Sequence, residues 1–221
     1  MPRQLPLPLE IRPALARGDF IVAPANETAV RFIDRWPNWP APIAVLHGPS
    51  GSGKSHLVEA WSVISDAQIF RATALPALGP AAIAIEDVDQ AQPSEERDRA
   101  LLALLDGASA GEPRALLLTA RRPPKEWPTA IGDLASRLAA VLAFPLWAPD
   151  DKLLSGLAHK LFADRQLRVS KTAVARILKT LERTPEAIHA FVAEADATAL
   201  AERRPVSERL VSELLDAREQ A

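Results

Sequence analysis

The sequence has 221 residues and no cysteine. This absence excludes disulfide bonds and thiolate metal sites, and it is typical of proteins from reducing compartments. No apolar run approaches 18 residues, and the first residues lack the long apolar core of a signal peptide. We therefore expect a cytoplasmic protein with no membrane partner.

Aromatic residues are also scarce: they make up 5% of the chain, and tyrosine is absent. The core should therefore consist mainly of Leu, Ala, Val and Ile. Of the five tryptophans, Trp61 and Trp147 are expected in the core. Trp36, Trp39 and Trp127 lie in proline-rich loops, where packing and a contact role both stay open.

An excess of positive charge is missing as well. The net charge is −2, with 14 basic and 16 acidic residues up to position 149 and 12 of each from position 150. Strong binding to nucleic acid requires a basic surface that neutralises phosphates. We therefore expect no direct sequence-specific binding to DNA.

Apolar runs alternate with amphipathic stretches up to about residue 149, and only helical spacing follows. This alternation predicts an α/β domain with a parallel sheet at 20–149 and a helical domain at 150–221, after an irregular segment at 1–19 that holds four prolines. The expected strands are 42–48, 67–72, 80–89, 114–120 and 139–147. The expected helices are 26–36, 54–65, 94–110, 150–166, 170–182, 184–204 and 207–219.

Residues at the helix starts sharpen this prediction. Asn26 is expected to cap the first helix, Ser94 the third, and Thr184 followed by Pro185 is a favourable start for the helix at 184–204. The charged stretch "SEERDR" at 94–99 is expected to be a solvated helix face.

The stretch "GPSGSGKS" at 48–55 matches the phosphate-loop pattern G-x-x-x-x-G-K-[ST] in full. It follows a predicted strand and begins a predicted helix, which is the context that the motif requires. Its glycines let backbone N–H groups approach phosphate oxygens, Lys54 would reach the β- and γ-phosphates, and Ser55 would hold Mg²⁺. The alternative is a glycine-rich turn with a chance lysine, which the flanking strand and helix disfavour.

Two acids end the predicted strand at 80–89. Glu86 and Asp87 have the place of carboxylates that hold the magnesium shell and orient water beside a phosphate loop. Taken alone, they are equally well acids at the surface end of a strand. The nearby phosphate loop favours the catalytic and metal-binding interpretation, with Mg²⁺ held by Ser55, Glu86 and Asp87.

Four stretches carry a family resemblance: "QLPLPL" at 4–9, "DFIVAPANETAV" at 19–30, "GPSGSGKSH" at 48–56 and "RRPPKEWPTAIGDLASRL" at 121–138. Because these four stretches occur in the family's order and spacing, the chain resembles the DnaA/Hda family of AAA+ proteins over nearly its whole length. The resemblance implies a P-loop AAA+ sheet domain followed by a small α-helical lid. It also implies bound ADP or ATP. The residues that it assigns to the nucleotide are Phe20, Ile21, Asn26, Gly48, Pro49, Ser50, Gly51, Ser52, Gly53, Lys54, Ser55 and His56.

The resemblance assigns one further catalytic residue and two partners. Arg137 matches the arginine finger, which would act in trans on ATP bound to DnaA. The segment "QLPLPL" matches the family's motif for binding the β subunit of the DNA polymerase sliding clamp. Its prolines pre-extend the backbone, which lowers the ordering cost on binding. The clamp-binding residues would be Gln4, Leu5, Leu7, Pro8 and Leu9.

Three positions depart from the family pattern. Glu86 stands where aspartate is usual, Arg121 stands where the family has an acid, with Thr119 as a partial substitute, and Glu186 stands at the lid arginine, with Arg183 three residues away. These departures predict little hydrolysis of the protein's own nucleotide. Two alternative functions stay open: a self-contained P-loop ATPase or kinase, and a helicase-loader-like ATPase for DNA replication. Self-association into a homo-oligomer also stays open.

Overall fold

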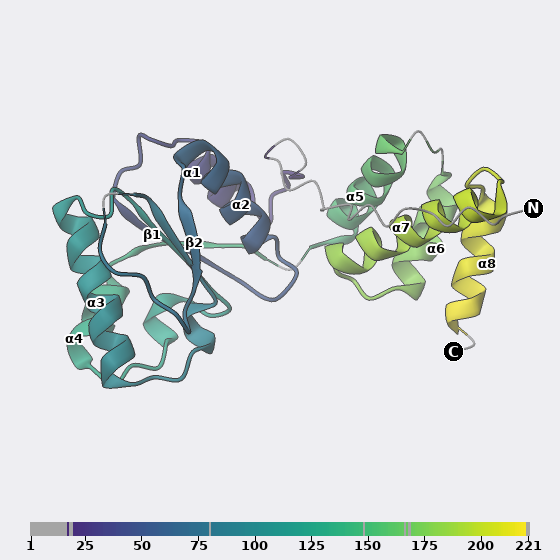
Figure 1. The fold of residues 1–221 in the computed structure, drawn as a ribbon. Helices are drawn as coiled ribbons and strands as arrows, with labels where there is room; N and C mark the ends of the chain where they lie inside the picture. The colour runs from purple at the N-terminus through teal and green to yellow at the C-terminus, as the bar shows by residue number, and fades with distance from the viewer. Residues whose placement is uncertain are drawn as a thin grey trace, which may run out of the picture.

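The computed structural model describes Arg17 and residues 20–79, 81–147, 149–165, 167 and 169–219. The predicted clamp-binding residues Gln4, Leu5, Leu7, Pro8 and Leu9 lie outside this part, as does the side chain of Glu186. The described chain has two parts, a sheet covered by helices and a separate helical bundle (Figure 1). Each part has its own apolar core.

Five parallel strands form the sheet, in the order β2-β3-β4-β1-β5. Every residue of β3 and β4 is buried, which is why these strands read as continuous apolar runs in the sequence. The predicted parallel sheet is thereby confirmed. The strands are β1 (Ile43–His47), β2 (Gln68–Arg71), β3 (Ile83–Glu86), β4 (Leu116–Ala120) and β5 (Leu142–Pro145).

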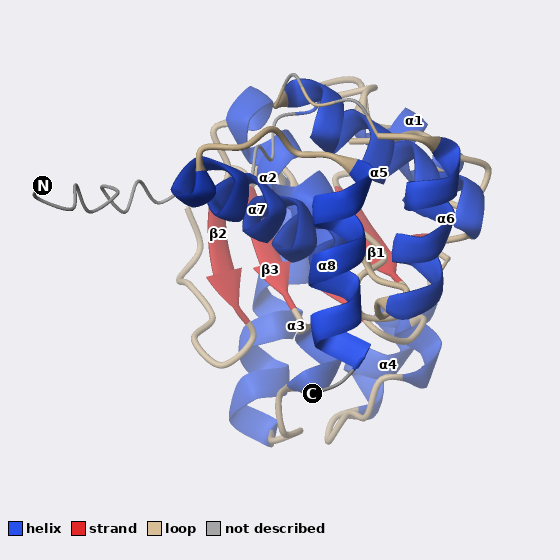
Figure 2. Ribbon diagram, turned by 90° about the vertical axis from the view of Figure 1, so that its right-hand side faces the viewer, coloured by secondary structure: helices blue, strands red, loops and turns tan. Residues whose placement is uncertain are grey.

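Helices cover both faces of the sheet, so this part has three layers (Figures 1 and 2). Alternate residues of one strand enter opposite cores: Leu117 belongs to the cluster with α1 and α2, whereas Leu116 and Leu118 belong to the cluster with α3 and α4. The covering elements are α1 (Glu27–Ile33), α2 (Lys54–Ser65), α3 (Glu95–Ala110), α4 (Gly132–Ala139) and the short 3₁₀ helices η2 (Val88–Gln90) and η3 (Pro124–Glu126).

The helical bundle follows the sheet. Its helices begin at hydroxyl or carboxylate caps: the side chains of Asp150, Ser170 and Thr184 accept hydrogen bonds from backbone N–H groups in the first turns of α5, α6 and α7. The predicted helix start at Thr184–Pro185 is confirmed. The bundle consists of α5 (Asp151–Asp164), α6 (Lys171–Thr180), α7 (Pro185–Glu202) and α8 (Glu208–Glu219).

The burial of the tryptophans differs in part from the prediction. Trp61 is fully buried as expected, and its ring stacks on Trp39 with the centroids 5.0 Å apart. Trp36 meets Trp61 edge-on, and the guanidinium of Arg114 lies over Trp36. The prediction for Trp147 was wrong, because its side chain is 64% exposed. It follows the fully buried Leu146, and successive side chains of an extended chain point to opposite sides.

The stretch "SEERDR" is only in part the solvated face that its charges predicted. Ser94 caps α3 as expected, by accepting from the N–H of Arg97. Asp98, however, is fully buried and accepts from the Arg97 guanidinium and from the backbone N–H groups of Ala130 and Ile131. The carboxylate of Asp98 therefore anchors the segment that leads into α4.

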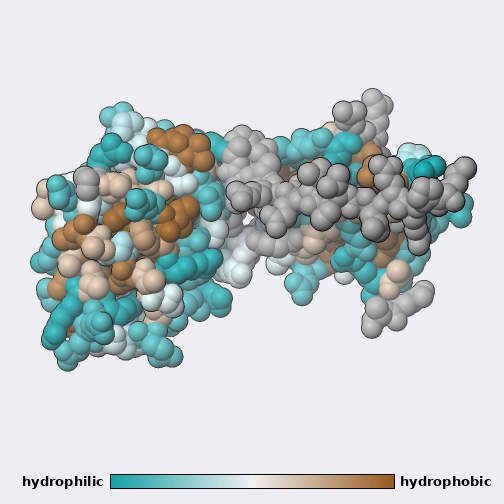
Figure 3. All heavy atoms as spheres, in the orientation of Figure 1, coloured by the Kyte–Doolittle hydropathy of each residue, from teal (hydrophilic) through white to brown (hydrophobic). Residues whose placement is uncertain are grey.

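The surface of the described residues is mixed in hydropathy (Figure 3). Hydrophilic and apolar side chains are interspersed on the face shown in Figure 3. Among the described residues, no helix is long and apolar enough to cross a bilayer.

The buried ion pair of Asp98 generates a prediction about stability. Replacing Asp98 with Asn removes the charge that neutralises Arg97 and weakens the acceptor for Ala130 and Ile131, so we expect the free energy of unfolding to fall by about 3 kcal/mol. Urea denaturation followed by circular dichroism measures this change. Arg99→Ala breaks an exposed pair with Glu95 on the same helix and should change stability by less than about 0.5 kcal/mol. Equal losses in the two variants would contradict the anchoring role.

Candidate nucleotide-binding site

The phosphate loop joins the carboxyl end of β1 to the start of α2. Two glycines are required there by their surroundings. A Cβ on Gly48 would lie 1.9 Å from the carbonyl oxygen of Leu146, and Gly53 has φ +92° with a Cβ position 2.9 Å from the ring of Phe20. Backbone packing therefore leaves no room for side chains at these two positions, and the loop ends at the N-terminus of α2, where the helix dipole favours an anion.

Lys54 is the first residue of α2 and is 7% exposed. Its Nζ donates to the carbonyl oxygens of Gly48 and Pro49, each at 2.8 Å. The ammonium thus lies inside the loop, where it adds a positive charge to the positive end of the α2 dipole. Ser55 follows on the exposed side of the helix. This arrangement suits an anionic group.

The acid pair lies at the end of β3, on the same edge of the sheet as the phosphate loop. Glu86 is 8% exposed, and its Oε1 atom is buried with no hydrogen-bond partner among the described residues. Asp87 adopts φ +57°, and its N–H donates to Oγ1 of Thr119 on β4 at 3.1 Å. Thr119 therefore positions the backbone of Asp87 from the neighbouring strand.

These acids fit a magnesium ion that is shared with phosphates. Within the described residues, no group of three His, Asp or Glu side chains could hold a metal by itself. Mg²⁺ is usually bound by one or two carboxylates together with phosphates and water, so a third protein ligand is not needed. The unpartnered Oε1 of Glu86 is an oxygen that could accept a hydrogen bond from a magnesium-bound water.

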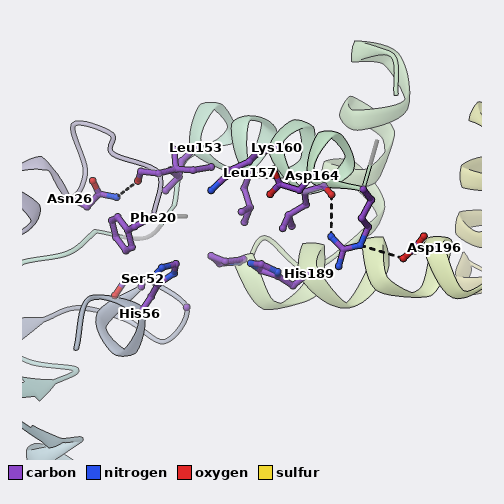
Figure 4. A pocket seen from close by; sticks show the side chains of 16 residues that line it. Phe20, Asn26, Ser52, His56, Leu153, Leu157, Lys160, Asp164, His189 and Asp196 are labelled. Atoms are coloured by element: carbon purple, nitrogen blue, oxygen red, sulfur yellow. Dashed lines mark hydrogen bonds and ion pairs between the residues drawn. The ribbon is translucent and has the colours of Figure 1, made fainter. Parts of the chain in front are cut away.

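A cavity of about 370 Å³ lies between the phosphate loop and the helical bundle (Figure 4). On the sheet side, the rings of Phe20 and His56 meet edge-to-face with their centroids 5.0 Å apart. On the bundle side, Leu157 and Lys160 come from α5 and His189 from α7. The volume is within the range of small-ligand pockets. Of the predicted nucleotide-binding residues, those that line this cavity are Phe20, Ile21, Asn26, Gly51, Ser52, Gly53 and His56.

The prediction that the Asn26 side chain caps the first helix was wrong. Asn26 is the residue before α1, but its side chain does not cap the helix. Instead, Oδ1 accepts from the N–H of Ala23 at 2.9 Å and Nδ2 donates to the carbonyl of Ile21 at 3.0 Å. The buried amide therefore fixes the turn at 21–23 on the wall of the cavity.

Of the two further departures from the family pattern, the structure describes Arg121, whereas the side chain of Glu186 lies outside the described part. The exposed Arg121 donates its backbone N–H to the buried carboxylate of Asp89, which also accepts from the N–H of Arg122. Sequence reasoning gave no such anchoring role to Asp89. Arg183 is exposed and pairs with Asp151, and it does not line the cavity. The structure thus gives no support to Arg183 as a replacement for a lid arginine.

His47 is the last residue of β1, directly before the loop. Burial lowers the pKa of its imidazole below the ordinary value, the carboxylate of Glu126 raises it in part, and the charge of Lys54 lowers it further. The lowered pKa favours the neutral form of this imidazole beside Lys54.

Arg137 lies at the opposite end of the sheet. It lines a second cavity, of about 260 Å³, with Pro42 and Ile43 at the amino end of β1. The five residues of β1 separate this end from the phosphate loop by about 13 Å at the usual rise of a strand. The guanidinium pairs with Asp106 and lies 4.0 Å from Asp133. Arg137 is therefore not brought together with the phosphate loop or with Glu86 and Asp87 of its own chain.

Comparisons with known proteins identify the fold. No family model matches the chain, and no curated protein matches its sequence. Domain III of the replication initiation protein DnaA from Thermotoga maritima matches with a TM-score of 0.75 and 14% identity, covering 93% of this chain and 97% of that one. AMPPCP-bound DnaA from Aquifex aeolicus matches with a TM-score of 0.71 and 15% identity, covering 85% of this chain and 66% of that one. RuvB from Thermotoga maritima matches with a TM-score of 0.70 and 12% identity, covering 92% of this chain and 72% of that one.

The chain has an AAA+ fold. This finding confirms the predicted fold class. At these identities the likeness concerns the fold alone, and the roles of individual residues stay predictions.

The contact between Gly53 and Phe20 can be tested with a matched control. Gly53 and Gly111 have nearly equal φ values, +92° and +99°, but a Cβ at Gly111 meets nothing within 4 Å. Alanine at either position has the same backbone strain, and only Gly53→Ala also displaces Phe20. We expect Gly53→Ala to lower the free energy of unfolding by about 1–3 kcal/mol more than Gly111→Ala in urea denaturation. Equal losses would show that Phe20 moves without cost.

Proposed function

We propose that this chain is an Hda-like AAA+ regulator that holds an adenine nucleotide and acts on the ATP of DnaA. The observation that carries the proposal is the opposite placement of two features in one fold. The phosphate loop opens on its own cavity, while Arg137 lies at the other end of β1. An arginine so placed is suited to a nucleotide on another molecule.

The nucleotide in this proposal is ADP or ATP. Lys54 and the loop N–H groups hold the phosphates, and the base lies in the cavity walled by Phe20, Ile21 and His56. Mg²⁺ would be held by Ser55, Glu86 and Asp87, where it would neutralise phosphate charge. Support comes from the buried lysine, from the unpartnered oxygen of Glu86 and from the structural likeness to a DnaA that was solved with AMPPCP.

In this proposal the protein's own hydrolysis is weak. The side chain of Glu86 is one methylene longer than the expected aspartate, which displaces the carboxylate by about a bond length, and such shifts matter for positioned groups. The backbone N–H of Arg121 donates to the buried carboxylate of Asp89. The nucleotide thus has mainly a structural task, holding the bundle against the sheet part.

The arginine finger acts in trans in this proposal. A guanidinium beside a transferred phosphoryl group stabilises its developing charge, an effect of roughly 10³–10⁵ in rate. In the isolated chain, Arg137 is 46% exposed at its side chain and its charge is balanced by Asp106 and Asp133. These exposed pairs are weak, so a more concentrated negative charge such as ATP displaces them readily.

The partners in this proposal are DnaA and the sliding clamp. The clamp would bind residues 4–9, whose leucines would fill an apolar pocket and whose prolines would lower the cost of an extended peptide. A clamp on DNA would bring the regulator to DnaA without a basic surface of its own. The near-neutral charge and the structural likeness to DnaA support this route.

The finger role predicts a loss of action on the partner. With clamp loaded on DNA, Arg137→Ala should reduce the stimulated hydrolysis of ATP on DnaA to near its basal rate, because the guanidinium is gone. Phosphate release from DnaA with radiolabelled ATP measures the effect. Arg99→Ala, which removes another exposed helix arginine, on α3, should keep the wild-type stimulation. Full stimulation by the Arg137 variant would contradict the role.

The same proposal predicts slow turnover by the protein alone. Steady-state release of phosphate from ATP with Mg²⁺ should stay well below about 1 s⁻¹, the lower range of ordinary enzymes. The assay is repeated with candidate acceptor molecules, so that transfer to an acceptor is also measured. Turnover at or above that rate would favour a self-contained ATPase or kinase over the regulator.

A further inference from the structure

Arg71 bridges the two acids that are proposed to serve the magnesium ion. It is the last residue of β2 and pairs in register with Glu86 of β3. Its Nη1 lies 2.7 Å from Oδ2 of Asp87, and its Nη2 lies 3.6 Å from Oε2 of Glu86. One guanidinium therefore faces both carboxylates from the neighbouring edge strand.

The two oxygens of Glu86 have different surroundings. Oε2 faces Arg71, whereas Oε1 is buried and has no hydrogen-bond partner in the described chain. An unpaired buried carboxylate oxygen is costly, so the site favours the arrival of a further positive charge or a bound water. The Arg71 guanidinium faces Oε2 and leaves Oε1 without a hydrogen-bond donor in the described chain.

Arg71 also draws Asp87 away from the phosphate loop. The strand order places β2 on the far side of β3, whereas the loop follows β1 beyond β4. The backbone of Asp87 is held by Thr119, so its side chain alone can turn between Arg71 and the loop side. A carboxylate that faces Arg71 is not available to a magnesium shell beside the phosphates.

We propose that Arg71 is a resident counter-ion that competes with Mg²⁺ for Glu86 and Asp87 and thereby sets the magnesium dependence of nucleotide binding. This inference rests on the proposed nucleotide site. Bound guanidinium reduces the net charge of the acid pair from −2 to −1, which weakens its attraction for a divalent cation. The side chain of Arg71 is 66% exposed, so it can leave the acids without disturbing the core. Arg71 is a positioning residue, because it acts through the carboxylates.

The experiment measures the binding of a fluorescent ADP analogue to the full chain at Mg²⁺ concentrations from chelator-treated buffer upward. In Arg71→Gln, the Mg²⁺ concentration at half-maximal enhancement of binding should fall roughly threefold to tenfold, as expected for loss of a partly exposed ion pair. Arg71→Lys keeps the charge and should stay near wild type. The control Arg99→Gln, an exposed arginine on α3, should leave the magnesium midpoint unchanged.

A double-mutant comparison separates competition from general loosening. In an Asp87→Asn background, the shift caused by Arg71→Gln should shrink, because the stronger of its two partners is already neutral. Circular dichroism establishes that every variant is folded. An unchanged midpoint in a folded Arg71→Gln variant that still binds the analogue would overturn the role of Arg71 alone. Failure of the wild-type protein to bind the analogue with either Mg²⁺ or chelator would overturn the nucleotide site, and this inference with it.

Discussion

The parallel register of the sheet is the constraint on which the rest of this structure depends. Because all five strands run in one direction, their carboxyl ends share one edge, and the phosphate loop, the acid pair and Thr119 meet there. The same register places Arg137 at the amino edge. The parallel arrangement thus separates the phosphate loop and the acid pair, which could serve the chain's own nucleotide, from Arg137, which could serve the nucleotide of a partner.

Two buried aspartates connect these edges to the rest of the fold. Asp89 holds the backbone after β4 through Arg121 and Arg122, and Asp98 holds the segment before α4 through Ala130 and Ile131. Neither carboxylate lines a described cavity. Together with the buried Trp127, they order the proline-rich segment between β4 and α4 and thereby place the helix that carries Arg137.

Much of the fold was predictable because its central strands β3 and β4 are buried throughout and read as apolar runs. The errors arise where contacts with other residues, rather than the type of the residue itself, decide the environment of a side chain. Asp98 stands in a charged stretch yet is buried, since a loop 32 residues away supplies its donors. Trp147 is apolar yet exposed, since Leu146 takes the inward position beside it. The Asn26 amide binds the preceding turn rather than the helix.

The sequence by itself determined the fold class, the strand that precedes the phosphate loop and the residues of that loop, because these depend on local spacing and burial pattern. Tertiary structure alone decided which side chains from distant parts of the sequence come into contact. It set Arg71 against Glu86 and Asp87, and it closed a cavity between Phe20 and α5. The reason is physical: the pairing of strands and the packing of helices bring together charges and rings whose separation along the chain carries no local signal.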